Sequence, residues 1–176
     1  IIPHHGIEKS LRDSGIPYTF LRPAYFMQNL TGNLKADIVE KDLIAVPAGE
    51  AEFALVDVRD MAEVVWEIFH APEDYFNKII TLTSGRHYSF SEISQILSEK
   101  LNRYIRYKSQ VLLPFIVRKW RETGSFGFSL VMALLHYLPR YQPKPELTKE
   151  IENILGRPPR ELKDFVKDHQ SSWINS

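Results

Sequence analysis

Residues 14–29 of this chain read SGIPYTFLRPAYFMQN, and the order of residue types in this stretch decides the fold. Gly15 stands where the first residue beyond a helix would lie, and residues 4–14 before it are amphipathic. Residues 18–21 are rich in β-formers and suit a buried strand of a parallel sheet, which the following Arg-Pro pair ends. A helix followed by a buried strand predicts an α/β layer at the start of the chain.

The rest of the chain continues this alternation of short strands and helices. Strand patterns cover residues 43–46, 53–56, 78–82 and 103–108. Helical patterns cover residues 24–42, where the pattern is weak, and residues 58–71, 90–101, 148–155 and 161–170, with two more helices in residues 111–141 separated near 124–127. Asp57 can cap one helix, and Ser89 with Glu92 has the capping-box spacing of another. We therefore predict an α/β fold with a helical tail.

The composition excludes several classes of protein. The 176 residues include 22 basic and 22 acidic side chains, which cancel, so a direct nucleic-acid partner is not expected. There is no cysteine, which excludes disulfides and thiolate nucleophiles. The apolar runs are well short of the roughly 20 residues that a membrane span needs. We expect a cytoplasmic protein that makes no membrane contact.

The segment after the first predicted strand is the best local candidate for a pocket wall. It holds Tyr25, Phe26, Met27, Gln28 and Asn29. Ligands of open α/β sheets bind beyond the carboxyl ends of the strands, which is where these residues would lie. The alternative is that the three large apolar side chains of the segment belong to the core. No glycine-rich phosphate loop, nucleophile elbow or zinc-protease motif occurs in the chain.

The first predicted helix carries a second set of candidate residues. His4 and Glu8 are four positions apart, so they can share a proton or a ligand, or both can lie on a solvated face. Lys9 and Arg12 can meet a phosphate or belong to the same solvated face. His4 and His5 are adjacent and diverge around a helix, so no metal site is expected.

Several stretches together resemble NmrA-like proteins, an atypical branch of the short-chain dehydrogenases/reductases. They are residues 4–11, 14–23, 26–29, 56–62, 82–101, 156–160 and 164–169. The resemblance covers nearly the whole chain, and residues 110–145 are the least similar to the family.

The resemblance implies a Rossmann sheet that binds NAD(P) and a smaller, mainly helical C-terminal subdomain that closes over the substrate. It assigns residues 1–30 and about 52–83 to the C-terminal half of the Rossmann-like part. Residues 31–51 and 84–176 become the substrate-binding subdomain.

The family's glycine-rich loop and first strands have no counterpart here, and Ile1 is preceded by neither an initiator Met nor a signal peptide. We therefore expect one incomplete domain, the truncated C-terminal part of a longer protein. Its parallel sheet would lack the N-terminal strands and keep an open edge. We expect weak or no NAD(P) binding by the chain alone, because the pyrophosphate lacks its helix N-terminus.

The resemblance also implies roles for residues. His4 stands eleven positions before Gly15, the place of the lysine in the family's Tyr-x-x-x-Lys pair, and is carried over as a catalytic and cofactor residue. Residues 25–29 run beside the nicotinamide in the family, and so are carried over as cofactor contacts. The implied cofactor is NAD(P), with NADP slightly favoured. No metal is implied.

Three hypotheses about function follow from the resemblance. The first is an NAD(P)H-dependent reductase of a small quinone-like or carbonyl acceptor, because direct hydride transfer needs less acid assistance than alcohol-dehydrogenase chemistry. The second is a dinucleotide-sensing regulator that binds a protein partner without turnover. The third is a truncated product with no activity of its own. A protein partner or a homo-oligomer is left open beside the small-molecule substrate.

Overall fold

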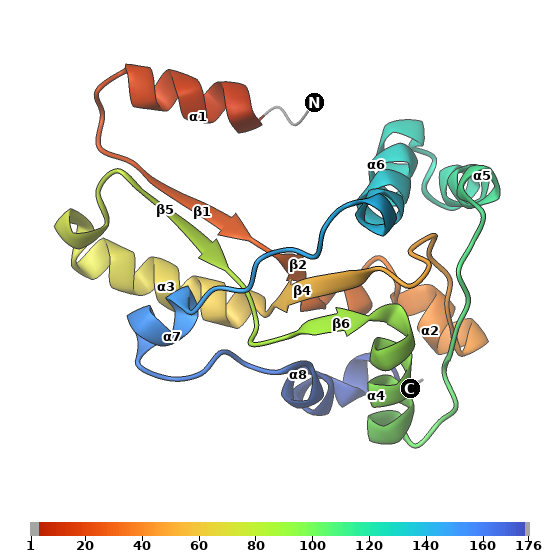
Figure 1. Ribbon diagram of the computed structural model, residues 1–176. Helices are drawn as coiled ribbons and strands as arrows, with labels where there is room; N and C mark the ends of the chain where they lie inside the picture. The colour runs from red at the N-terminus through yellow and green to blue at the C-terminus, as the bar shows by residue number, and fades with distance from the viewer. Residues whose placement is uncertain (1–3, 175–176) are drawn as a thin grey trace.

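The computed structural model describes residues 4–174, with only the backbone of His4 and His5, and shows an α/β fold (Figure 1). The α-helices are α1 (His4–Asp13), α2 (Lys35–Lys41), α3 (Val58–His70), α4 (Phe90–Leu101), α5 (Leu112–Thr123), α6 (Phe126–Tyr137), α7 (Glu150–Leu155) and α8 (Leu162–Asp168). The strands are β1 (Thr19–Pro23), β2 (Tyr25–Phe26), β3 (Leu43–Ile44), β4 (Glu52–Val56), β5 (Lys78–Leu82), β6 (His87–Ser89) and β7 (Arg106–Tyr107). Short 3₁₀ turns occupy Met27–Leu30, Pro72–Tyr75, Leu138–Tyr141 and Gln170–Ser172.

Most strand pairs are parallel, as an α/β layer requires. β1 pairs with β5 in parallel, with Thr19 opposite Lys78 and Pro23 opposite Leu82. β4 lies between β2, which is parallel to it, and β6, which is antiparallel to it. β3 and β7 form a further short parallel pair. Among the described residues, β1 pairs only with β5, so its other edge is open.

Local signals in the sequence set the helix ends where they were predicted. The Asp57 side chain accepts a hydrogen bond from the backbone N–H of Arg59 and caps α3. Ser89 and Glu92 form the complete capping box of α4. Gly124 ends α5 with φ of 71°, a conformation that favours glycine, and so separates it from α6.

The prediction of a helix over residues 24–42 is wrong in its first half. Tyr25 and Phe26 are extended instead, because they pair with Leu55 and Val56 of β4. A 3₁₀ turn follows them, and α2 begins only at Lys35. Pairing with a strand that lies far along the chain overrides a weak local helical pattern here.

Other strand boundaries also differ from the prediction. The strands expected over residues 43–46 and 103–108 shrink to β3 and β7, although the N–H of Gln110 still donates to the carbonyl of Val46. β6 was not predicted, because its three residues are too few to show a periodicity.

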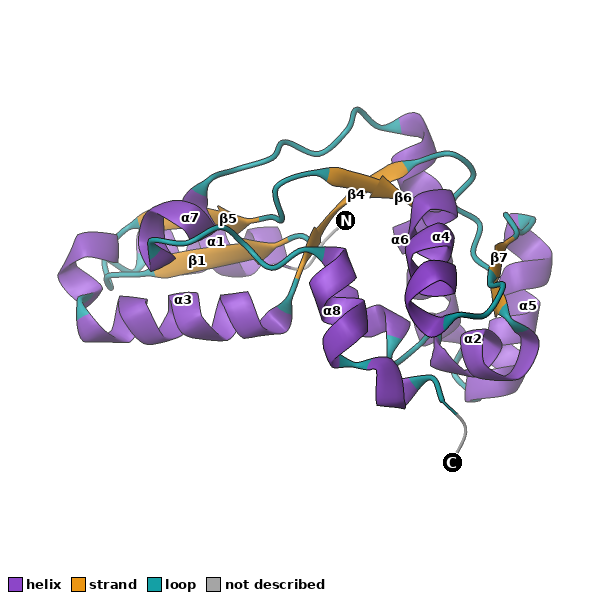
Figure 2. Cartoon of the chain, turned by 90° about the horizontal axis from the view of Figure 1, so that it is seen from below, coloured by secondary structure: helices purple, strands orange, loops and turns teal. Residues whose placement is uncertain are grey.

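The hydrophobic core has two parts, which lie on opposite sides of β4 in Figure 2. The smaller part packs α3 and α7 against β1 and β5, through Val64, Ile80, Leu82 and Ile151 among others. The larger part gathers residues of α2, α4, α5, α6 and α8. The division into a Rossmann-like part and a substrate subdomain stays a prediction. In this predicted division, α7 falls in the substrate subdomain, but in the structure it packs in the smaller part of the core.

No helix within the described residues has the length and apolar character needed to cross a membrane.

Candidate functional site

A cleft of about 770 Å³ opens just beyond the carboxyl end of β1. The lining residues come from four segments: Pro23, Ala24, Tyr25, Phe26 and Asn29; Glu52, Phe53 and Ala54; Leu135 and Pro139; and Gln142, Pro143 and Pro145. The first group contributes to both hydrophobic cores, so the cleft lies where the two cores meet. This is the position at which open α/β sheets bind their ligands.

The structure brings three of the six predicted cofactor residues together in the cleft. Tyr25, Phe26 and Asn29 line it. Met27 is fully buried in the larger core, as the alternative interpretation held for the apolar members of the segment. Gln28 is half-buried and is hydrogen-bonded away from the cleft. The assignment of these residues as cofactor contacts stays a prediction.

Gln28 anchors the cleft loop to the start of α3. Its amide N–H donates to Asp57 Oδ1 at 2.9 Å, and its carbonyl oxygen accepts from the backbone N–H of Val58 at 3.1 Å. Arg59 Nη2 contacts Asp57 Oδ2 at 2.7 Å. Burial alone would raise the pKa of Asp57, but the hydrogen bonds from Arg59 and Gln28 outweigh it and hold that pKa below its usual value.

Tyr25 of the cleft wall meets a histidine that lies behind it. The Tyr25 hydroxyl lies 3.0 Å from His136 Nε2, and His136 Nδ1 lies 2.6 Å from the backbone carbonyl oxygen of Met132. His136 has no solvent exposure. Burial lowers its pKa to about 4, and the positive charge of Lys119 adds to this effect, so His136 is neutral near pH 7. Burial also raises the pKa of Tyr25, which the Asn29 side chain partly opposes.

The walls of the cleft are aromatic and apolar. The Tyr25 ring meets Phe53 and Phe90 edge to face, with ring centroids 5.6 and 6.0 Å apart. Among the described lining residues, none is Lys, Arg or His, and Glu52 is the one with a charge. Glu52 Oε2 is paired with Lys144 Nζ at 2.8 Å. Such a cleft suits a flat, apolar ring with few polar groups.

The candidate residues of α1 are partly engaged with one another. His4 begins α1, but its side chain lies outside the described residues, so its proposed contact with Glu8 stays a prediction. Glu8 Oε2 pairs with Arg22 Nη2 at 2.7 Å and with Arg12 Nη2 at 3.0 Å, and these guanidinium groups lower the pKa of Glu8. Lys9 is exposed. Figure 1 shows α1 standing off from the strand pair, to which Arg22 ties it.

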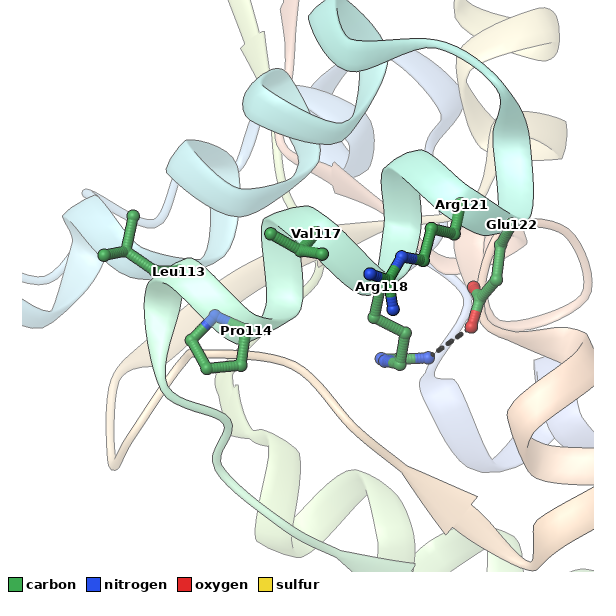
Figure 3. Close-up of a pocket in the computed structure, with 6 residues that line it drawn as sticks. All are labelled: Leu113, Pro114, Val117, Arg118, Arg121 and Glu122. Carbon is green, nitrogen blue, oxygen red and sulfur yellow. Dashed lines mark hydrogen bonds and ion pairs between the residues drawn. The ribbon is translucent and has the colours of Figure 1, made fainter.

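A second hollow lies on the outer face of α5 (Figure 3). It is lined by Leu113, Pro114, Val117, Arg118, Arg121 and Glu122, which all belong to one helix. Arg118 is already engaged there, by Glu122 and by Asp37 of α2, each at 2.9 Å. Among the residues that the structure describes, no second element lines this hollow, so we regard the cleft at β1 as the functional candidate. The described residues contain no cluster of side chains suited to a metal ion.

Residues 3–164 match the model of the NmrA-like family. The chain belongs to this family. The match covers all the segments that line the cleft. The fold is therefore the Rossmann-like fold of the NmrA-like proteins.

Two curated relatives of this NmrA-like chain carry the names of redox enzymes. Agroclavine dehydrogenase from Claviceps fusiformis is 27% identical over 164 residues, which are 91% of this chain and 56% of the relative. An NAD(P)H azoreductase from Xenophilus azovorans is 27% identical over 169 residues, 94% of this chain and 57% of the relative. The chain thus spans a little over half the length of these relatives.

Solved structures share the fold. Triphenylmethane reductase from Citrobacter sp., solved in complex with NADP(H), superposes with a TM-score of 0.83 at 23% identity and covers 96% of this chain and 60% of its own. NmrA, a negative transcriptional regulator solved with NAD, superposes with a TM-score of 0.65 at 17% identity, over 98% and 60% of the two chains. At these identities the likeness concerns the fold alone.

Sequence reasoning missed His136, which lies in the segment least similar to the family. Its one signal is that it stands as an ionisable residue in the mostly apolar helix α6, FGFSLVMALLHY. Such a residue needs a buried polar partner. The sequence does not show that this partner is Tyr25, which lies 111 positions earlier.

Proposed function

We propose that this chain is the C-terminal part of an NAD(P)H-dependent reductase that passes hydride to a small quinone-like or carbonyl acceptor. The observation that carries the proposal is the apolar, aromatic cleft beyond the carboxyl end of β1, lined by Tyr25, Phe26 and Asn29. The redox names of the relatives and the NADP(H) bound to a structural neighbour support it.

The nicotinamide end of the cofactor fits the residues that are present. Its ring would lie against Tyr25 and Phe26, and the Asn29 amide offers a donor and an acceptor to a carboxamide group. The diphosphate end would depend on a glycine-rich loop, which these 176 residues do not contain. When bound, the dinucleotide supplies the hydride. We favour NADP slightly over NAD, and we expect the protein to act in the cytoplasm.

The chain's own residues position the acceptor and exclude water. Phe53 and Leu135 present apolar side chains to it from β4 and α6. Gln28 and Asp57 hold the loop that carries Tyr25 and Asn29. A nicotinamide ring on this loop would therefore keep a fixed distance from the acceptor ring. Tyr25 is a poor proton donor, because burial raises its pKa and His136 takes its hydrogen bond. This arrangement favours acceptors whose anion, formed by hydride transfer, takes up its proton in the solvent after it leaves the cleft.

The second candidate function is a dinucleotide-sensing regulator with a protein partner. NmrA is described as a negative transcriptional regulator, and an exposed apolar surface on α5 and α6 favours this function here. This surface comprises Leu113, Val117, Trp120, Phe126 and Val131. The two functions differ in turnover.

The experiment that separates them measures NADPH oxidation by the complete protein, with the N-terminal half of the fold ahead of this chain. Menadione, an azo dye and an aromatic aldehyde serve as acceptors. The reductase account predicts saturable oxidation with at least one of them. Phe53→Ala should lower kcat/KM by roughly tenfold, because it opens the cleft wall. Tyr137→Phe, on the outer side of α6, is the control and should leave kcat/KM unchanged. NADPH binding without turnover of any acceptor would favour the regulator.

A further inference from the structure

We propose that His136 is a positioning residue that turns Tyr25 into a hydrogen-bond acceptor, so that the cleft selects flat aromatic ligands carrying an O–H or N–H donor. The inference rests on the proposed function in one respect, namely that this cleft is where the acceptor and its reduced product bind. His136 itself contacts no ligand, since it has no solvent exposure.

The backbone decides which nitrogen of His136 carries the proton. Nδ1 lies 2.6 Å from the carbonyl oxygen of Met132, and a carbonyl oxygen can only accept. Nδ1 therefore donates, and in the neutral ring Nε2 keeps a lone pair. A second proton on the ring would place a charge in a fully buried site, close to Phe53, Phe90 and Phe115.

The tautomer of His136 in turn fixes the Tyr25 hydroxyl. This hydroxyl has one proton, and it donates that proton to Nε2 across 3.0 Å. The oxygen keeps two lone pairs, and a lone pair can only accept. Tyr25 lines the cleft, so a ligand that reaches one of these lone pairs must bring a donor of its own.

The charges around the cleft narrow the ligand class further. Among the described lining residues Glu52 is negative and none is basic, and the nearby Lys144 is already paired with Glu52, so an anionic ligand would have to compete with Glu52 for this cation. The aromatic edges of Tyr25 and Phe53 suit a flat ring. The matching ligand is a neutral aromatic compound with a phenolic or amine-type donor, the form that a hydroquinone or an aromatic amine product would have.

Three probes of one ring system test this selectivity on the full chain without any cofactor. They are 2-naphthol, which carries a donor, 2-methoxynaphthalene, which carries only an acceptor, and 2-naphthoate, which is anionic. Ligand-detected NMR titrations give the ratio of the dissociation constants. We expect 2-naphthol to bind roughly three- to tenfold more tightly than the methyl ether, the equivalent of one hydrogen bond, and naphthoate to bind most weakly.

Variants separate positioning from simple packing. Tyr25→Phe should equalise 2-naphthol and the ether. His136→Leu should reverse their order, because the freed hydroxyl of Tyr25 can then donate to the ether oxygen. His136→Gln should restore the wild-type order, since its amide can donate to Met132 and accept from Tyr25. Tyr137→Phe, whose hydroxyl bonds Tyr141 on the surface, is the matched control and should keep the wild-type ratio.

An equal affinity for 2-naphthol and the ether in the wild type would overturn the inference. So would a preference for 2-naphthol that survives in Tyr25→Phe. If His136→Leu does not fold, the comparison of Tyr25→Phe with His136→Gln still tests the inference. The Tyr25 oxygen that accepts the ligand's hydrogen bond is present in His136→Gln and absent from Tyr25→Phe. The result is independent of turnover: a complete protein that selects 2-naphthol through Tyr25 yet never oxidises NADPH would refute the reductase function and leave the inference standing.

Discussion

Asp57 is a buried carboxylate whose environment links the stability of the fold to the shape of the site. It has no solvent exposure, it caps α3, and it holds both Gln28 and Arg59. Removing one partner of such a buried cluster leaves the other polar groups unpaired, which costs far more than one exposed hydrogen bond.

We expect Asp57→Ala to lower the free energy of unfolding by roughly 3 kcal/mol, because the cap is lost, Gln28 is left without its acceptor and Arg59 keeps only its pairing with Asp168. Urea denaturation measures the change. Asp74→Ala, at an exposed acidic position in the Pro72–Tyr75 turn, is the control and should change it by less than about 0.5 kcal/mol. Equal losses in the two variants would contradict the role given to Asp57.

His136 gives a prediction about pH. Its folded-state pKa of about 4 lies below the ordinary value of 6.5, so between these values the unfolded chain binds a proton that the folded chain does not. Stability should therefore fall as the pH falls through this window, and His136 should account for roughly 2–3 kcal/mol of the loss between pH 7 and pH 4. Denaturation curves of wild type and His136→Gln at both pH values measure it. An identical pH dependence in the two proteins would show that His136 is not held neutral.

The start of a helix in this chain is set by hydrogen bonds between residues close in sequence, whereas the short strands are set by pairing with a strand elsewhere in the chain. The capping box at Ser89 fixes the start of α4, because all its hydrogen bonds lie within one turn. β2 and β6 depend instead on their pairing with β4, and no periodicity in their few residues shows it. The candidate site divides in the same way. The position of Tyr25 after β1 was predictable, whereas its pairing with His136 depends on how α6 packs.

The capping box allows a test at the level of one helix. Ser89→Ala should cost about 1 kcal/mol of unfolding free energy, because the backbone N–H of Glu92 loses its acceptor at the start of α4. Gln95→Ala, on the exposed side of the same helix, should be neutral or slightly stabilising, since alanine is the better helix former. Thermal denaturation followed by circular dichroism compares the two. A cost at Gln95 equal to that at Ser89 would mean that the cap contributes nothing.

The whole molecule presents an open sheet edge and exposed apolar side chains beside it. β1 pairs on one side only among the described residues, and Ile7, Ile16, Trp66 and Phe69 are exposed on or beside the helices next to it. Such an edge can pair with another chain. We expect the purified chain to form concentration-dependent oligomers in sedimentation velocity runs. Placing the N-terminal half of the fold ahead of it should abolish this association. A chain that stays monomeric at high concentration would show that the edge is protected in another way.

The central claim is that this chain carries the acceptor cleft and the nicotinamide wall of a dinucleotide-dependent reductase but not the diphosphate site. A binding titration of NADPH and NADH, run in parallel on this chain and on the complete protein, tests it most directly. The account predicts saturable binding by the complete protein, with NADPH slightly tighter than NADH, and no saturable binding by the chain alone. Micromolar binding by the chain alone would contradict the account, because the whole cofactor site would then lie within these 176 residues.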